Sequence, residues 1–131
     1  MIPQIAKVQS IEDVIKMAEQ VDLPLGHFSI PGVYVRAMMI PKDTVLTGKV
    51  HNHECVSIVA KGSITVTDGN TPKRLEAGWI GITPPGLKRA GFAHEDTVFI
   101  TAHRCDETEI EKIEHFLVSE SYEQFLLRAD T

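Results

Sequence analysis

The sequence lacks the features that mark secreted, membrane-spanning and nucleic-acid-binding proteins. It has two cysteines, Cys55 and Cys105, too few for the disulfide framework of a small secreted protein. Its apolar runs fall short of the roughly 20 residues that a membrane-spanning helix needs, and its first residues lack the pattern of a signal peptide. Acidic residues outnumber basic ones by 18 to 13, so the net charge is −5. We therefore expect a cytoplasmic protein whose main partner is neither a membrane nor a nucleic acid.

Linkers, repeats and low-complexity segments are also absent from the sequence. A chain of 131 residues that is 43% hydrophobic is large enough to bury one core without disulfides or metals. We expect a single domain over residues 1–131, with an N-terminal helix and loop at 1–32, a β-rich core at 33–105 and C-terminal helices at 106–131.

The middle of the chain has the pattern of short strands separated by turns. Several segments are rich in β-branched residues, and most are bounded by glycine, proline or aspartate. The predicted strands are 33–40, 44–50, 55–60, 64–67, 73–75, 79–83, 87–92 and 97–103. So many short strands predict a mostly β fold, either a sandwich or a barrel.

Both ends of the chain have helical patterns. Ser10, followed by Glu12, predicts a helix that begins near Ser10, with the hydroxyl as its N-cap. The prolines and glycines of 24–32 predict a loop. Thr108 begins a capping-box pattern, and 122–127 predicts a last short helix. These segments place helices on either side of the β-rich core.

Three side chains that bind metals lie at alternate positions of one extended stretch. His51, His53 and Cys55 would share a face if this stretch were a continuous strand. A further ligand would have to come from another strand, and His103 is the best candidate. These four residues predict a site for a divalent transition metal such as Zn, Fe, Ni or Mn. The alternative is that the histidines are partly buried, hydrogen-bonded residues that bind no metal.

Two sets of residues match the motifs of a known superfamily. The stretch 49–53 and Gly62 match the centre and end of the first cupin motif, and Gly78, Pro84 and Gly86 have the spacing of the second. The sequence therefore resembles the cupin superfamily. This resemblance implies a single cupin-type jelly-roll β-barrel with an N-terminal helix and a C-terminal helical segment. It also implies a homodimer formed through the outer sheets.

A narrower resemblance concerns the setting of the protein. The stretches 47–51, 85–89 and 93–103 are similar to those of uncharacterised cupin-like proteins of tailed bacteriophages and prophages. This resemblance implies a phage or prophage protein that acts in the host cytoplasm, and it implies no particular activity. In that group the position of Cys55 tends to be histidine, which favours His51 and Cys55 as the main members of the row.

The chain departs from the cupin motifs at two metal-binding positions. Ser57 or Ile58 stands where the first motif has glutamate, and Arg89 stands where the second has histidine. A guanidinium pointing into the barrel needs an anion or a carboxylate as its partner. Arg89 therefore predicts a pocket for a small polar or anionic ligand. The alternative is that Lys88 and Arg89 are solvated charges at a sheet edge.

Two further residues are expected to line this pocket. Tyr34 shares a strand face with Arg36, and Thr101 shares one with His103. We assign Arg89, Tyr34 and Thr101 as ligand-binding residues. The preferred hypothesis is a cupin-like protein that binds a small polar or anionic molecule, and the alternative is a metal-dependent cupin enzyme. A structural role without any ligand is the third possibility.

Overall fold

The computed structural model describes residues 3–18, 20 and 23–129 of the chain. Its helices are α1 (Pro3–Ile15), α2 (Ile110–Leu117) and α3 (Tyr122–Ala129). Its strands are β1 (Leu25–Ile30), β2 (Val33–Ile40), β3 (Val45–Thr47), β4 (Val50–His51), β5 (Cys55–Lys61), β6 (Ser63–Thr67), β7 (Lys73–Glu76), β8 (Ile80–Thr83), β9 (Ala90–Ala93), β10 (Thr97–Arg104) and β11 (Val118–Ser119).

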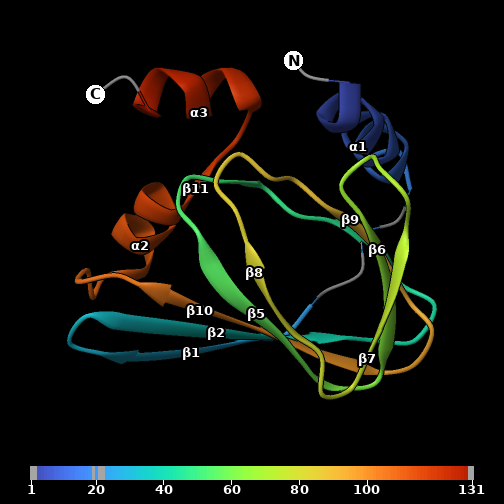
Figure 1. Cartoon of the computed structure of the whole chain (residues 1–131), viewed down its shortest axis with the longest axis horizontal. Coiled ribbons are helices and arrows are strands. Elements are labelled where there is room, and N and C mark those ends of the chain that lie inside the picture. The colour runs from blue at the N-terminus through green and yellow to red at the C-terminus, as the bar shows by residue number, and fades with distance from the viewer. Residues whose placement is uncertain (1–2, 19, 21–22, 130–131) are drawn as a thin grey trace.

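The strands form two antiparallel sheets that face each other (Figure 1). One sheet has the order β1-β2-β10-β5-β8, the other has the order β3-β9-β6-β7, and β4 pairs with β11. In Figure 1, α1 and α3 lie above the barrel, with α1 above β9 and α3 near β11, and α2 lies at its left side above β10. The main helix contacts are made with β3, β9, β4 and β11, so the outer face of the five-stranded sheet is left uncovered by the described helices.

Two apolar clusters stabilise this arrangement at different ends of the barrel. The first consists of Ile40, Val59, Ile64, Leu75 and Ala93, which come from both sheets. The second joins the barrel to α2 and consists of Tyr34, Cys105, Ile113 and Leu117. Burial of these side chains is the main source of stability for such a small fold.

The strands predicted from the sequence are all present, with changes at their ends. The segment 44–50 is divided, because β3 ends at Thr47 and β4 begins at Val50. The segment predicted at 87–92 becomes a strand only at Ala90. The predicted loop at 24–32 is wrong, since it contains β1, which forms a hairpin with β2 through a turn at Gly32. Strand β1 is an edge strand with little burial, so it lacks the alternation by which strands are recognised.

Both predicted helix starts are wrong. Helix α1 begins at Pro3, and proline is favoured at the first position of a helix. Ser10 lies inside the helix, where its hydroxyl donates to the carbonyl oxygen of Ala6 at 3.0 Å. The predicted capping box at Thr108 does not form, because the N-cap of α2 is Glu109, whose side chain makes no capping hydrogen bond. Helix α3 is present as predicted and extends to Ala129.

None of the helices in the described part of the chain is long and apolar enough to cross a membrane.

Candidate functional site

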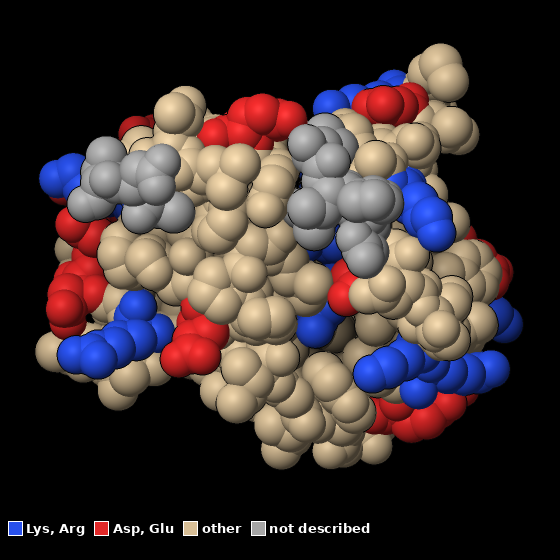
Figure 2. Space-filling view, turned by 45° about the horizontal axis from the view of Figure 1, so that its top comes forward, with Lys and Arg blue, Asp and Glu red and all other residues tan. Residues whose placement is uncertain are grey.

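A cavity of about 260 Å³ lies between the two sheets, and its wall includes residues of β2, β3, β5, β6, β9 and β10. Figure 2 shows a hollow on the side of the molecule that carries the helices, with Lys or Arg side chains inside it. The cavity extends inward to the first apolar cluster, since Ile40 and Ile64 belong to both. A concave site lined by both apolar and polar side chains is the usual form of a small-molecule pocket.

Adjacent strands place three polar side chains at one level of the pocket. Thr101 of β10 pairs with Arg36 of β2 on one side and with Ser57 of β5 on the other. Residues paired directly across antiparallel strands point to the same face, so all three line the cavity. The level therefore contains one guanidinium and two hydroxyl groups.

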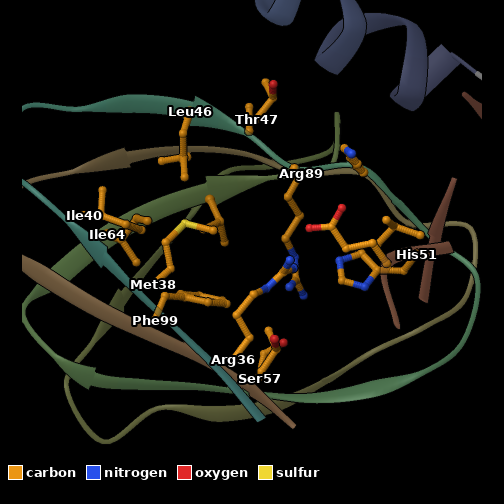
Figure 3. Close-up of a pocket in the computed structure, with 18 residues that line it drawn as sticks. Arg36, Met38, Ile40, Leu46, Thr47, His51, Ser57, Ile64, Arg89 and Phe99 are labelled. Atoms are coloured by element: carbon orange, nitrogen blue, oxygen red, sulfur yellow. The ribbon is translucent and has the colours of Figure 1, made fainter. Parts of the chain in front are cut away.

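Arg89 reaches the same end of the pocket from the loop before β9 (Figure 3). Its guanidinium donates a hydrogen bond to Oγ1 of Thr83 at 2.8 Å, and that oxygen lies 2.7 Å from Oγ of Ser57. Burial lowers the pKa of Arg89 from its ordinary value, but a guanidinium stays charged in proteins. The hydroxyl groups hold Arg89 in position without neutralising it.

Neither Arg36 nor Arg89 forms an ion pair with any carboxylate of the described residues. Glu114 of α2 also lines the cavity, but it is an exposed residue. Two guanidinium groups therefore face one half-enclosed space, and no protein carboxylate pairs with either in the described part of the chain. Partly buried positive charges of this kind favour an anion between them.

The two histidines near this end are neutral at physiological pH. Burial, with the nearby charges of Arg89 and Arg36, lowers the pKa of His51 to about 4. Burial, with the nearby charge of Arg36, likewise lowers the pKa of His103 to about 4. His103 shares a hydrogen bond of 2.8 Å between its Nε2 and Oγ1 of Thr101. The positive charge of the site at pH 7 thus comes from the two guanidinium groups and from Lys49, which also lines the cavity but is paired with Glu120 at 2.8 Å.

Three of the four predicted metal ligands lie near one another. His51 Nδ1 is 3.9 Å from the Sγ of Cys55, and the rings of His51 and His103 are stacked with centroids 6.4 Å apart. Burial raises the pKa of Cys55, so its thiol stays protonated unless a metal displaces the proton. The fourth residue, His53, is exposed and stacks on Phe116 with a centroid separation of 4.3 Å. Within the described ranges, no group of three His, Cys, Asp or Glu side chains is arranged to hold a metal ion.

The prediction of a continuous strand through His51, His53 and Cys55 is wrong, because the chain bends after β4. At this bend Asn52 is hydrogen-bonded to the end of α2. Its backbone N–H donates to the Leu117 carbonyl oxygen at 2.8 Å, and its side-chain amide donates to the Phe116 carbonyl oxygen at 3.1 Å. The alternation of faces is therefore lost between His51 and His53.

The predicted ligand-binding residues occupy different places. Arg89 and Thr101 line the cavity. Tyr34 does not line it, since it is 2% exposed and belongs to the cluster beneath α2. The Tyr34 hydroxyl is hydrogen-bonded to Nδ1 of His27, and the ring lies beside His103. Arg36, two residues along the same face, is the residue that reaches the pocket.

Lys88 is not the solvated edge charge of the alternative prediction. Its side chain is 2% exposed, and its Nζ lies 2.7 Å from Oε2 of Glu12 on α1. The same amine donates to Gln9 at 3.2 Å, and Glu12 also accepts a hydrogen bond from Thr47 at 2.8 Å. Lys88 therefore attaches α1 to the barrel next to the pocket, while its neighbour Arg89 enters the pocket.

Comparison with known proteins identifies the fold. No family model and no curated protein matches the chain. Among solved structures, KdgF from a Halomonas species is 16% identical with a TM-score of 0.56, and the match covers 70% of this chain and 86% of that chain. An uncharacterised double-stranded β-helix protein from Klebsiella pneumoniae is 18% identical with a TM-score of 0.58, with coverages of 70% and 84%.

A third similar structure is a protein of the cupin superfamily. An RmlC-like cupin protein with a double-stranded β-helix fold, from Methanocaldococcus jannaschii, is 16% identical with a TM-score of 0.54, and the match covers 69% of this chain and 94% of that chain. Likenesses at this level of identity show the fold alone. The predicted fold is confirmed: the chain is mostly β and has the cupin double-stranded β-helix, with one helix before the barrel and helices after it.

Proposed function

We propose that this protein binds a small anionic molecule in the barrel pocket, with Arg36 and Arg89 as the charged residues that hold it. The observation that supports the proposal is that two guanidinium groups face the same cavity without a carboxylate partner among the described residues. A carboxylate or phosphate between them would accept charge-assisted hydrogen bonds from both. Ser57 and Thr101 supply hydroxyl groups at the same level.

The tailed-phage or prophage setting implied by the sequence is part of this proposal. A small protein that binds a host metabolite without transforming it needs a pocket and no catalytic groups. The proposal assigns this role to the cavity lined by Arg36, Arg89 and the neutral His51.

The test compares anion binding by the wild-type protein and by variants of the two arginines. We expect Arg36→Gln and Arg89→Gln each to weaken the binding of benzoate by about 10- to 100-fold, because a hydrogen bond to a charged group contributes about 1.5–3 kcal/mol. Isothermal titration calorimetry measures the change. Arg104→Gln is the matched control, since Arg104 is an exposed residue of β10 that does not line the pocket. Equal benzoate affinity in all four proteins would refute the assignment.

A metal-dependent enzyme remains the second candidate, because His51, Cys55 and His103 lie together near the pocket. In the structure these three side chains are not arranged to hold a metal ion, so a divalent Zn, Fe, Ni or Mn ion would require them to move closer together; once bound, it would supply Lewis-acid or redox chemistry. The donor set fits such an ion only in part. It lacks a carboxylate, and the charges of Arg36 and Arg89 close to His51 disfavour a dication. One equivalent of metal in the untagged protein, lost in His51→Ala, would make this candidate the primary one.

We also propose that the uncovered face of the five-stranded sheet binds a second copy of this chain. It carries exposed apolar side chains on β1, β5 and β8, among them Phe28, Ile30, Val56, Ile80 and Ile82, which are 61%, 68%, 39%, 65% and 69% exposed. Five strands spaced at about 4.8 Å and roughly 18 Å long give a face of roughly 450 Å². Two such faces in contact approach the roughly 1,000 Å² of a specific interface, and larger exposed apolar patches mark interaction sites.

A single charge in this face should separate the two copies. We expect Ile82→Glu to convert a dimer into a monomer, because each copy would bury a carboxylate without a partner. Light scattering coupled to size exclusion measures the mass. Leu127→Glu, at a residue of α3 that is 71% exposed, is the control and should remain dimeric. A wild-type protein that is monomeric at tens of micromolar would contradict the dimer.

A further inference from the structure

The two ends of the pocket differ in chemistry. Figure 3 shows Arg36, Arg89, Ser57 and His51 together at one end. At the other end the cavity is lined by the apolar side chains of Met38, Ile40, Leu46, Ile64 and Phe99. A small hydrophilic anion would occupy only the first end.

The separation follows from the alternation of side chains along paired strands. Arg36, Met38 and Ile40 are successive inward residues of β2, so the wall changes from charged to apolar along one strand. Strand β10 shows the same change from polar to apolar side chains, because Thr101 pairs with Arg36 and Phe99 pairs with Met38. Two residues of a strand span about 7 Å, so the charged and apolar levels are separated by about that distance.

The volume of the cavity sets the size of its occupant. A cavity of about 150 Å³ lined by apolar side chains holds one benzene molecule. The pocket here measures about 260 Å³, which leaves room for a carboxylate or a similar group beside a body of that size.

We infer that the ligand is an amphipathic anion, with one anionic group bound by Arg36 and Arg89 and an apolar body bound between Met38 and Phe99. This inference rests on the proposed function of the pocket. A polyhydroxylated or doubly charged molecule would bury polar groups against Met38 and Phe99, where they find no hydrogen-bond partner. A neutral apolar molecule would remove water from two guanidinium groups without pairing them.

The test is a series of carboxylates titrated into the wild-type protein by calorimetry. Acetate, butanoate and hexanoate carry the same anionic group with an increasing apolar chain, and benzoate carries a ring. We expect affinity to rise about fourfold for each added methylene, or about 200-fold from acetate to hexanoate. Hexan-1-ol, which lacks the charge, and citrate, which lacks the apolar body, should each bind at least tenfold more weakly than hexanoate.

A substitution at the apolar end supplies a second readout. Met38→Gln keeps the length of the side chain and makes it polar. It should therefore reduce the rise in affinity for each added methylene, and it should leave the affinity for acetate within twofold of the wild type. This comparison uses ratios within one variant, so a small loss of stability does not affect it.

The possible results distinguish the amphipathic ligand from the underlying anion site. If acetate, hexanoate and citrate bind alike and all depend on Arg36 and Arg89, the amphipathic ligand is wrong and the anion site stands. If hexan-1-ol binds as tightly as hexanoate and the arginine variants change nothing, the anion site is wrong as well. If no carboxylate binds at millimolar concentration, both are overturned.

Discussion

Replacing Glu12 with glutamine is expected to lower the free energy of unfolding by about 3 kcal/mol, because it leaves the buried ammonium of Lys88 without a counter-charge. Lys88 is 2% exposed, and its Nζ lies 2.7 Å from Oε2 of Glu12. Glu12 also accepts a hydrogen bond from Thr47 of β3. The substitution therefore weakens the attachment of α1 to the barrel at two points.

Chemical denaturation of the Glu12→Gln protein measures this loss, and an exposed ion pair provides the control. Glu120→Gln removes the partner of Lys49 in a pair whose side chains are 73% and 47% exposed, so it should cost less than about 0.5 kcal/mol. The double substitution Glu12→Gln with Lys88→Met should recover part of the stability, since no buried charge remains. Equal losses in Glu12→Gln and Glu120→Gln would show that the Lys88 pair contributes no more than a surface pair.

The same pair gives stability a defined pH dependence. Burial alone would raise the pKa of Glu12, but hydrogen bonds from Lys88 and Thr47 and the charge of Lys88 lower it to about 2. A carboxylate whose folded pKa is depressed contributes stability that is complete above its unfolded pKa, about 4.5, and is lost as the pH falls towards 2. The stability difference between wild type and Glu12→Gln should therefore shrink between pH 5 and pH 2.

The second large effect is expected at Gly62, the turn between β5 and β6. Its φ angle is +88°, and a Cβ atom there would lie 2.4 Å from the Asp96 carbonyl oxygen and 2.8 Å from the Cα of Thr97. Gly62→Ala must therefore displace the backbone before β10, and we expect a loss of about 3 kcal/mol or more.

Gly78→Ala separates the two causes of this loss. Gly78 has a similar φ of +99°, but no atom lies within 4 Å of the position of its Cβ. Gly78→Ala should therefore lower the free energy of unfolding by only about 1 kcal/mol, the penalty for an L-residue at positive φ. Urea unfolding of both variants measures the difference of about 2 kcal/mol that the close approach to Asp96 contributes. Similar losses at the two glycines would mean that the backbone at Asp96 gives way easily.

The sequence predicts the barrel well because its strands are marked by local signals. The segments 33–40 and 97–103 have β-branched residues and clear turn boundaries, and they match β2 and β10 closely. Strand β1 lacks these signals because it lies at the sheet edge, and its pairing with β2 is a tertiary feature. The sequence predicts too late a start for helix α1, because Ser10 is a residue type that favours the N-cap but lies inside the helix.

The candidate site was predicted only where alternation along one strand was sufficient. Thr101 reaches the pocket as expected, and so does Arg89 from its loop. His53 was misplaced because the chain bends at Asn52, which is hydrogen-bonded to α2, and residues 65 positions apart leave no local pattern. Tyr34 and Arg36 share a face, but α2 covers the end of the barrel where Tyr34 lies. That packing decides which of the two lines the cavity.

The burial of Lys88 illustrates the same limit. Adjacent basic residues look alike in a sequence, yet Lys88 pairs with Glu12 and Arg89 enters the pocket. Their side chains point in different directions, since the Lys88 amine contacts Gln9 and Glu12 of α1 whereas the Arg89 guanidinium donates to Thr83. Lys88 has a structural role only because α1 packs next to it, and its partner Gln9 on α1 is 79 residues away in the sequence.

The most direct test of the anion site is a crystal structure of the untagged protein soaked with hexanoate. We expect a carboxylate within about 3 Å of both the Arg36 and Arg89 guanidinium groups, with the alkyl chain against Met38 and Phe99. A transition metal bound by His51, Cys55 and His103 with hexanoate as its ligand, or a pocket without hexanoate while Arg36 and Arg89 face water, would contradict this expectation.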